Sequence, residues 1–423
     1  MNKTTEALRR SDFEIMAPVG SFESLSAALR AGADAVYFGI EGLNMRSRSS
    51  ANFTSADMAR IAELCNRCGV KTYLTVNTVI YDSDMTLMRT IIDAAKDAGI
   101  SAIIASDMAA ILYARSRGVK VHISTQVNVS NTEAVAFYAQ WADVMVLARE
   151  LNMEQVAQIS RSIVERDIRG PHGNPVRLEM FCHGALCMAV SGKCYLSLHE
   201  LNSSANRGAC NQICRRGYTV RDRETGEELD VENKYIMSPK DLKTIHFLNK
   251  MVDAGVRVFK IEGRARGPEY VAETVGCYSE ALQAICEGTY SERGIARWDE
   301  RLQRIFNRGF WNGYYMGQRL GEWSSKYGSS ATRVKQYSSK VVRYFPRLGV
   351  GEFLLEADEL HVGDEVVITG STTGALLFKV PEIRVDLKSV EKAVKGDRFS
   401  MPVPAKVRPS DKLYYWKPLP PRD

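Results

Sequence analysis

Hydrophobic residues between positions 13 and 263 recur as short apolar runs, and an amphipathic segment that ends near glycine follows most of them. Such runs are typical of parallel strands covered on both faces, and the amphipathic segments are typical of helices with one buried face. The expected strands are residues 14–19, 35–40, 71–77, 102–106, 120–126, 144–149, 177–182 and 258–263. The expected helices are residues 21–32, 55–69, 82–99, 107–118, 130–142 and 153–166.

Eight consecutive strand–helix units indicate one fold. They close naturally into a (β/α)8 barrel of the TIM type. A doubly wound open sheet is the alternative, but no GxGxxG follows the first strand, so a dinucleotide-binding fold is unsupported. We therefore assign residues 13–320 to an α/β barrel, preceded by an N-terminal tail at 1–12.

One connection is far longer than the others. Roughly 75 residues separate the seventh and eighth strands, well beyond the usual loop length. We place a cysteine-rich insertion at 183–242 and expect a β-hairpin over 218–237 and a helix over 241–255. An insertion after a barrel strand lies at the C-terminal face, where barrel enzymes keep their active sites.

The pattern changes again after the barrel. Helices are expected over 268–288 and 296–309, followed by a polar linker, rich in Ser and Lys, at 321–337. Strand-length alternating segments then predict a small all-β, barrel-like domain at 338–423.

Composition places the chain in a broad class. The 423 residues are 45% apolar and 25% charged, which is ordinary for a globular protein. No apolar run is long enough to span a membrane, and the start lacks the apolar core of a secretory signal, so we expect a cytoplasmic protein. Thiols stay reduced there, and clustered cysteines then indicate metal binding or catalysis. A net charge of +6 permits a polyanionic partner.

Five of the nine cysteines lie within residues 181–218. Four of them, Cys187, Cys194, Cys210 and Cys214, have the spacing C-x6-C-x15-C-x3-C. A 4Fe-4S cluster tolerates irregular spacing and needs four cysteines. Structural zinc usually takes short CxxC knuckles, which are absent from this stretch. Buried free cysteines are the third alternative.

Several motifs resemble family 32 of the unassigned (U) peptidases, the collagenase-like family. The resemblance rests on FCHGALCMAVSGKCYLS with ANRGACNQICR, on APVGSFESLSAALRAGADAVYFG, and on MSPKDL, KIEGRARGPEYVAETV and RGFWNGYYMG. It is strongest to members that hydroxylate the wobble uridine of tRNA. It implies that Cys187, Cys194, Cys210 and Cys214 hold a 4Fe-4S cluster. It also implies an oxygen-independent reaction with prephenate as the small-molecule hydroxyl donor. Cys182 departs from the family pattern, which leaves open whether a fifth thiol exchanges into the cluster.

Polar residues follow several of the expected strands and form a candidate catalytic rim: Asn77, Gln126, Arg149, Glu150, Glu262 and Arg264. Amides can recognise the edge of a base, and guanidinium groups can clamp carboxylate or phosphate. Internal salt bridges are the alternative for Arg149–Glu150 and Glu262–Arg264.

Further arginines are expected near the same rim: Arg46, Arg48, Arg207, Arg215, Arg216 and Arg266. Together they would form a basic collar for RNA phosphates, and a solvated surface of mixed charge is the alternative.

Together with the cysteine spacing, the resemblance implies an iron–sulfur tRNA hydroxylase that makes 5-hydroxyuridine. The first alternative is a genuine collagenase-like peptidase. No HExxH or GxSxG occurs, and Cys182 and His183, as neighbours on a strand, point to opposite faces and make a poor catalytic pair. The second alternative is a non-catalytic RNA-binding or partner subunit with a structural cluster.

Overall fold

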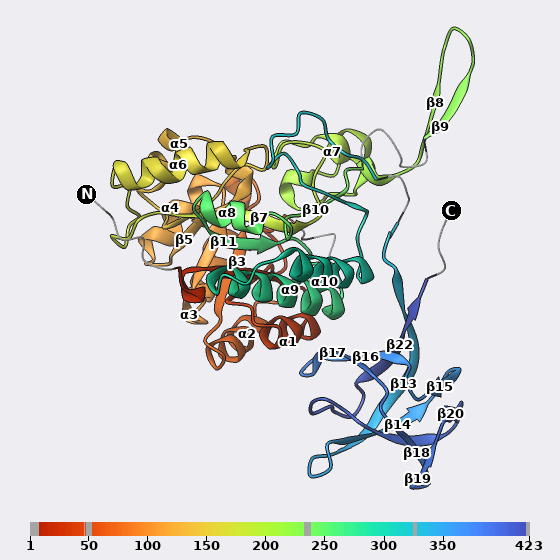
Figure 1. Ribbon diagram of the computed structural model, residues 1–423. Coiled ribbons are helices and arrows are strands. Elements are labelled where there is room, and N and C mark those ends of the chain that lie inside the picture. Colours follow the sequence, from red (N-terminus) through yellow and green to blue (C-terminus); the bar gives the residue numbers. More distant parts are fainter. Residues whose placement is uncertain (1–7, 46, 48–52, 232–237, 325–327, 420–423) are drawn as a thin grey trace.

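Eight parallel strands form a closed barrel in the computed structural model, which describes residues 8–45, 47, 53–231, 238–324 and 328–419 (Figure 1). Hydrogen bonds run in the order β11-β1-β2-β3-β4-β5-β6-β7, and β7 pairs with β11 to close the ring. The (β/α)8 prediction is therefore confirmed. The strands are β1 (Glu14–Pro18), β2 (Ala35–Phe38), β3 (Lys71–Val76), β4 (Ala102–Ala105), β5 (Val121–Ile123), β6 (Val144–Val146), β7 (Arg177–Gly184) and β11 (Val256–Ile261).

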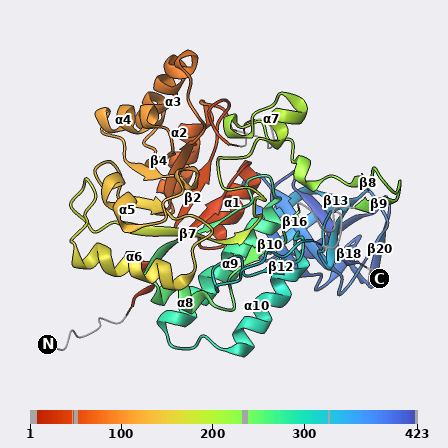
Figure 2. The same ribbon diagram turned by 90° about the horizontal axis from the view of Figure 1, so that it is seen from above.

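Helices surround the strands as an outer layer (Figure 2). They are α1 (Phe22–Arg30), α2 (Asp57–Asn66), α3 (Met85–Asp97), α4 (Met108–Ser116), α5 (Thr132–Tyr138), α6 (Met153–Glu165), α8 (Leu248–Asp253), α9 (Pro268–Cys286) and α10 (Glu292–Arg304). Ser21 begins α1 as an N-cap, since its hydroxyl accepts a hydrogen bond from the Ser24 amide at 3.2 Å.

Side chains alternate across each barrel strand. On β1, Ile15 and Ala17 pack outward into the large cluster between strands and helices, whereas Met16 joins a separate buried cluster with Tyr37 and Tyr73. The period of two expected for strands thus separates a helix-facing core from a barrel interior.

The insertion leaves the barrel after β7 and returns beside it. It contains α7 (Leu196–Leu201) and a hairpin of β8 (Tyr218–Arg221) and β9 (Glu228–Val231), which projects from the body (Figure 1). The predicted hairpin is confirmed over these strands, and 232–237 lie outside the described residues.

The helix predicted over 241–255 is wrong in its first part. β10 (Asp241–Lys243) pairs antiparallel with the end of β7, and only Leu248–Asp253 is helical. The end of β7 pairs with β11 along one edge, and its other edge is open to β10. Hydrogen bonding to that edge overrides the local helix preference of residues 241–243. β12 (Phe310–Trp311) adds to β10.

The C-terminal part is all-β, as predicted. One sheet runs in the order β17-β16-β22-β13-β14-β21-β18-β19, and β15 pairs with β20. β13 begins at Arg333, inside the segment predicted as linker. The strands are β13 (Arg333–Phe345), β14 (Val350–Leu355), β15 (Glu359–His361), β16 (Glu365–Gly370), β17 (Gly374–Lys379), β18 (Ile383–Val385), β19 (Lys388–Val390), β20 (Lys392–Val394), β21 (Arg398–Pro402) and β22 (Lys412–Pro418).

This β region packs against α1 and α9 of the barrel (Figure 1). The Ser26 hydroxyl donates to the Ser371 carbonyl at 2.7 Å, and Lys335 pairs with Glu269 at 3.0 Å. Gly374 comes so close that a Cβ there would lie 2.6 Å from the Ala27 nitrogen. The contact between the two parts therefore depends on a glycine.

Within the described ranges, each helix is too short or too polar to cross a lipid bilayer.

Candidate functional site at the barrel mouth

A cavity of about 220 Å³ opens where the strand ends meet the insertion. The loops after β3, β5, β6, β7 and β11 supply one wall, and the cysteine-rich segment supplies the other. Parallel strands bring all their carboxyl ends to one face, so residues far apart in sequence meet here.

All four cysteines of the predicted cluster line this cavity. Cys187 is exposed, and Cys194, Cys210 and Cys214 are half-buried and carry free thiols. Burial raises the pKa of Cys214, Arg215 lowers it, and the other three cysteines raise it further. The four sulfurs therefore share one electrostatic environment.

Gly208 explains how the cysteine segment reaches the barrel. It has a φ of +84°, and a Cβ there would overlap the Asn44 carbonyl oxygen and the Ser47 hydroxyl. Only glycine fits both demands, so Gly208 lets the chain before Cys210 approach the loop after β2.

The four thiols are the candidate ligands of a metal centre. Across the described ranges, no group of three or more His, Cys, Asp or Glu side chains is arranged to hold a metal ion. Tetrahedral zinc would need its sulfurs about 4 Å apart, from zinc–sulfur bonds of roughly 2.3 Å. A four-iron cluster binds each thiolate at a different corner, so it holds its four sulfurs further apart.

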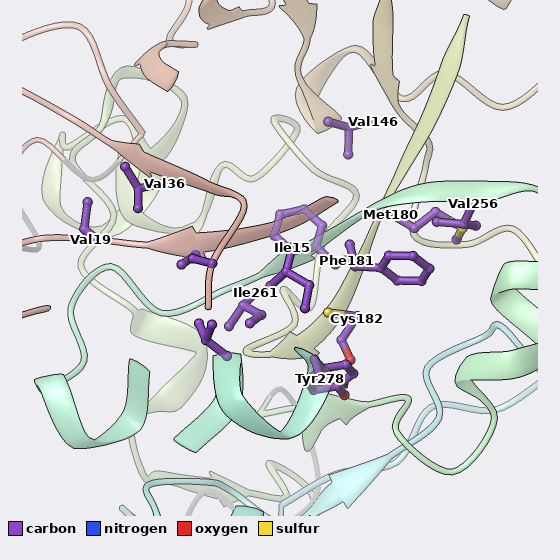
Figure 3. Packing of buried hydrophobic residues seen from close by; sticks show 14 of the residues in the cluster. Ile15, Val19, Val36, Val146, Met180, Phe181, Cys182, Val256, Ile261 and Tyr278 are labelled. Carbon is purple, nitrogen blue, oxygen red and sulfur yellow. Dashed lines mark hydrogen bonds between the residues drawn. The ribbon is translucent and has the colours of Figure 1, made fainter. Parts of the chain in front are cut away.

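Cys182 faces away from the cavity. It is fully buried against α9, next to Tyr278, whose hydroxyl donates to the Cys182 carbonyl at 2.7 Å (Figure 3). Its thiol donates to the Lys260 carbonyl at 3.4 Å. The question that Cys182 raised is thus answered by its position: it belongs to the layer between strands and helices.

His183 lies in that layer too, so the expectation that Cys182 and His183 point to opposite faces is wrong, because the register of β7 against β11 shifts between Phe181 and His183. Its ring packs among Tyr270, Tyr278 and Phe310, and burial lowers its pKa to about 3. Burial raises the pKa of Cys182 well above its usual value. Near neutral pH neither group is charged, so they do not form the thiolate–imidazolium pair of a thiol peptidase.

Two predicted amides meet at the cavity. Asn77 Nδ2 donates to Ser124 Oγ at 3.3 Å and to Gln126 Oε1 at 3.2 Å, and Ser124 also contacts the Gln126 amide. Asn128, in the left-handed region at φ 58°, donates to the carbonyls of Gln126 and Ser191. A continuous amide edge therefore lies along the ends of β3 and β5.

Arg149 and Arg215 hold the chain just before Cys187. Arg149 Nη1 donates to the Ala185 carbonyl at 3.2 Å, and Arg215 Nη2 donates to the Leu186 carbonyl at 3.0 Å. Arg149 Nε and Arg215 Nη1 are buried and have no hydrogen-bond partner. Both guanidinium groups thus keep donors for a bound molecule. Glu150 lies exposed on the surface.

Glu262 and Arg264 follow the end of β11 and line the same cavity. The Tyr37 hydroxyl donates to Glu262 Oε2 at 3.3 Å. Arg264 Nη1 donates to Asn44 at 3.2 Å and to Thr75 at 3.0 Å. Neutral oxygens therefore position this guanidinium group at the cavity wall.

The arginines predicted to form a basic collar have different surroundings. Arg207 is bound to Asp84 and lies over the Tyr81 ring, Arg216 is exposed, and Arg266 lies over the Phe306 ring. Arg46 and Arg48 lie outside the described residues. Arg207 thus has a structural partner that the sequence did not indicate.

Asp241 and Arg308 were missed from the sequence. Burial raises the pKa of Asp241, while Arg308, Arg215 and Arg266 lower it. Arg308 lies 3.4 Å from Asp241, and burial lowers the pKa of Arg308 to about 10. The signal was available in MSPKDL and RGFWNGYYMG, motifs that contain these two residues.

The cavity is strongly basic. Among the residues that the structure describes, six cationic side chains and one carboxylate, that of Glu262, line it; the six are Arg149, Arg215, Lys260, Arg264, Arg266 and Arg308. Such an excess in a partly buried site favours an anionic occupant.

Comparisons with known proteins agree with this architecture. The model of peptidase family U32 matches residues 20–325. A Porphyromonas gingivalis protein named collagenase is 69% identical over 404 residues, 96% of this chain and 98% of that protein. The tRNA hydroxylation protein P1 of Bacillus subtilis is 32% identical and covers 74% of each chain. A 23S rRNA 5-hydroxycytidine synthase of Escherichia coli is 33% identical over 73% of this chain and 46% of that protein. These matches show that the chain belongs to peptidase family U32.

Proposed function

We propose that the protein is an iron–sulfur-dependent RNA hydroxylase that forms 5-hydroxyuridine at the wobble position of tRNA, without molecular oxygen. The observation that carries the proposal is the meeting of Cys187, Cys194, Cys210 and Cys214 at one cavity on the active face of the barrel. Relatives named for tRNA and rRNA hydroxylation support the substrate class.

The four thiolates would hold a 4Fe-4S cluster, which supplies electron transfer when bound. The thiols must lose their protons for this, and Arg215 favours the ionised form of Cys214. Arg149 and Arg215 would keep the backbone before Cys187 in place through the carbonyls of Ala185 and Leu186.

The remaining lining would bind the reactants. The amide edge of Asn77 and Gln126 can recognise an unpaired pyrimidine, which the open wobble position offers. The cationic excess suits RNA phosphate at the outer end and the carboxylates of a small hydroxyl donor such as prephenate inside.

A collagenase-like peptidase is the competing function, because a protein of that name is 69% identical. The buried, uncharged state of Cys182 and His183 argues against a thiol mechanism at that pair.

A deletion strain separates the two functions. Nucleoside mass spectrometry of its tRNA should show loss of 5-hydroxyuridine, restored by the wild-type gene and by Cys286→Ala, which alters a cysteine on α9 outside the cavity, but not by Cys194→Ala. Unchanged 5-hydroxyuridine in the deletion strain would refute the proposal. Gelatin cleavage by purified wild type and Cys194→Ala alike would support the peptidase instead.

A further inference from the structure

The barrel interior beneath the cavity is unusually polar. TIM barrels fill this space mainly with branched apolar side chains. Here Lys260, Glu179 and His122 occupy it, with exposed fractions of 5%, 0% and 6%. Burying such groups is costly unless each one has a partner or a task.

These three side chains form a row that starts at the cavity. Lys260 lines the cavity and lies over the rings of Tyr37 and Phe181. Its Nζ is 2.8 Å from Glu179 Oε1. Glu179 Oε2 is 4.0 Å from His122 Nδ1, and neither of these two atoms has a hydrogen-bond partner. The row therefore has a close ion pair at the cavity end, between Lys260 and Glu179, and a gap without a hydrogen bond at the inner end, between Glu179 and His122.

A second set of polar side chains lies below His122, at the end of the barrel away from the cavity. The His122 ring lies 4.4 Å from the Tyr73 ring, and the Tyr73 hydroxyl donates to Glu14 at 2.7 Å. Glu14 pairs with Lys71 at 2.7 Å and Arg177 at 3.2 Å. Lys71 is half-exposed at the opposite end of the barrel. Polar groups thus extend from the cavity along the barrel axis towards solvent.

Burial and the neighbouring charges have opposing effects on the pKa values of Glu179 and His122. Burial raises the pKa of Glu179, while Lys260 and Arg177 lower it and Glu14 raises it. Burial lowers the pKa of His122 to about 4; Glu14 raises it, and Lys260, Arg177 and Lys71 lower it. A carboxyl group whose proton affinity is raised, next to a neutral imidazole, is suited to receive a proton.

We propose that Lys260 is the proton-transfer group of the cavity and that Glu179 and His122 form a relay behind it. The Lys260 ammonium passes one proton to the Glu179 carboxylate, and the resulting amine accepts the proton that leaves the reacting carbon. Lys260 then carries its charge again, and the Glu179 proton moves on to His122 Nδ1, from which it returns through Glu179 and Lys260 to water in the open cavity after the product leaves. The inference rests on the proposed function: the small-molecule donor delivers the hydroxyl group at the oxidation level of OH+, the electron pair of the ring C–H bond is kept in the product through the new C–O bond, and the ring hydrogen leaves as one proton.

If the Lys260–Glu179 ion pair were purely structural, replacing it would change the hydroxylation rate little; if it is a relay, the rate would fall. Replacing a buried ion pair by apolar side chains of similar size is often neutral or stabilising. Lys260→Met/Glu179→Leu should therefore fold with a Tm close to that of wild type. The relay predicts that its hydroxylation rate falls by about 100-fold or more, the usual range for a lost acid–base group.

The chain offers a matched control. Lys243 also forms an ion pair, a half-buried one, with Asp299 at 2.8 Å, and lies over the Phe310 ring, but it is outside the cavity lining. Lys243→Met should leave the hydroxylation rate within about threefold of wild type. Glu179→Gln should retain the shape but change the pH profile of the rate, which a structural role would not do.

One readout does not depend on activity. Because Lys260 lowers the pKa of His122, Lys260→Met/Glu179→Leu should move the His122 titration, measured by nitrogen NMR of labelled histidine, away from about pH 4. An unmoved titration, or wild-type turnover in the double variant, would overturn the relay. Absence of 5-hydroxyuridine in RNA treated with folded, cluster-loaded wild type and the hydroxyl donor would instead refute the proposed function, and the NMR result would still test the coupling.

Discussion

The thiol of Cys182 on β7 donates a hydrogen bond to the backbone carbonyl of Lys260 on β11, across 3.4 Å. Register along these paired strands shifts at this point, where Lys260 opposes Phe181 and Ile261 opposes His183. The irregularity turns Cys182 towards α9 and leaves Phe181 and Lys260 at the cavity. This fifth cysteine is thereby kept out of the cavity that Cys187, Cys194, Cys210 and Cys214 line.

This geometry predicts the iron content of two variants. Cys182→Ala should retain the iron of wild type, measured after anaerobic purification, and lose about 1 kcal/mol of unfolding free energy from the smaller buried side chain. Cys194→Ala should lose most of its iron. Equal iron loss in both variants would contradict the position of Cys182.

Arg207 and Arg216 should differ in their effect on RNA. Arg207 forms a two-point ion pair with Asp84, at 2.6 and 3.2 Å, so Arg207→Met should cost about 1 kcal/mol of stability and leave the salt dependence of RNA binding unchanged. Arg216 is exposed, so Arg216→Ala should reduce the slope of log affinity against log salt by about 0.7–0.9. Filter binding of an anticodon stem-loop at several salt concentrations measures both, and identical slopes would contradict this division.

Gly374 should control the docking of the β region. It has a φ of +73°, and an added Cβ would lie 2.6 Å from the Ala27 nitrogen and 2.8 Å from the Ser26 carbonyl carbon. Gly374→Ala should therefore loosen the contact between β17 and α1 by about 1–3 kcal/mol. Limited proteolysis should release the two parts faster than in wild type. Gly396→Ala is the matched control, because it also has positive φ but meets nothing within 4 Å, and equal release from both would contradict the prediction.

Two buried histidines should make the barrel sensitive to acid. Their pKa values, about 3 for His183 and about 4 for His122, lie below the value near 6.5 of an unfolded histidine. Between these values the unfolded chain binds more protons, so stability is lost as pH falls below about 6.5, by up to about 1.4 kcal/mol per pH unit for each histidine. Urea unfolding at several pH values should show that His183→Phe removes about half of this slope. An unchanged slope would contradict the prediction, because it would mean that His183 binds as many protons in the folded state as in the unfolded state.

The barrel could be predicted because its strands carry their signal locally. Continuous apolar runs located all eight strands, since burial on both faces leaves no room for polar residues. β10 could not be found in this way. Its three residues, Asp241–Lys243, are too few for a period, and only the free edge of β7 makes them a strand.

The candidate site was predictable only in part. The cysteine spacing predicted that Cys187, Cys194, Cys210 and Cys214 act together, and the structure brings all four to one cavity. The sequence could not show that Arg207 is bound by Asp84 or that Lys260 points into the barrel. Both facts depend on contacts between residues 81 or more positions apart, which no local pattern records.

The pairing of β10 with β7 has a consequence for how the insertion can vary. Leu242 opposes Gly184 and Lys243 opposes His183, so the insertion departs and returns at adjacent points on one strand. Because its two ends are held side by side by strand pairing, this segment can be lengthened, shortened or replaced without moving the barrel strands. Changes in this segment alone can then reshape the rim of the cavity, while the ring of strands and its buried charges stay in place.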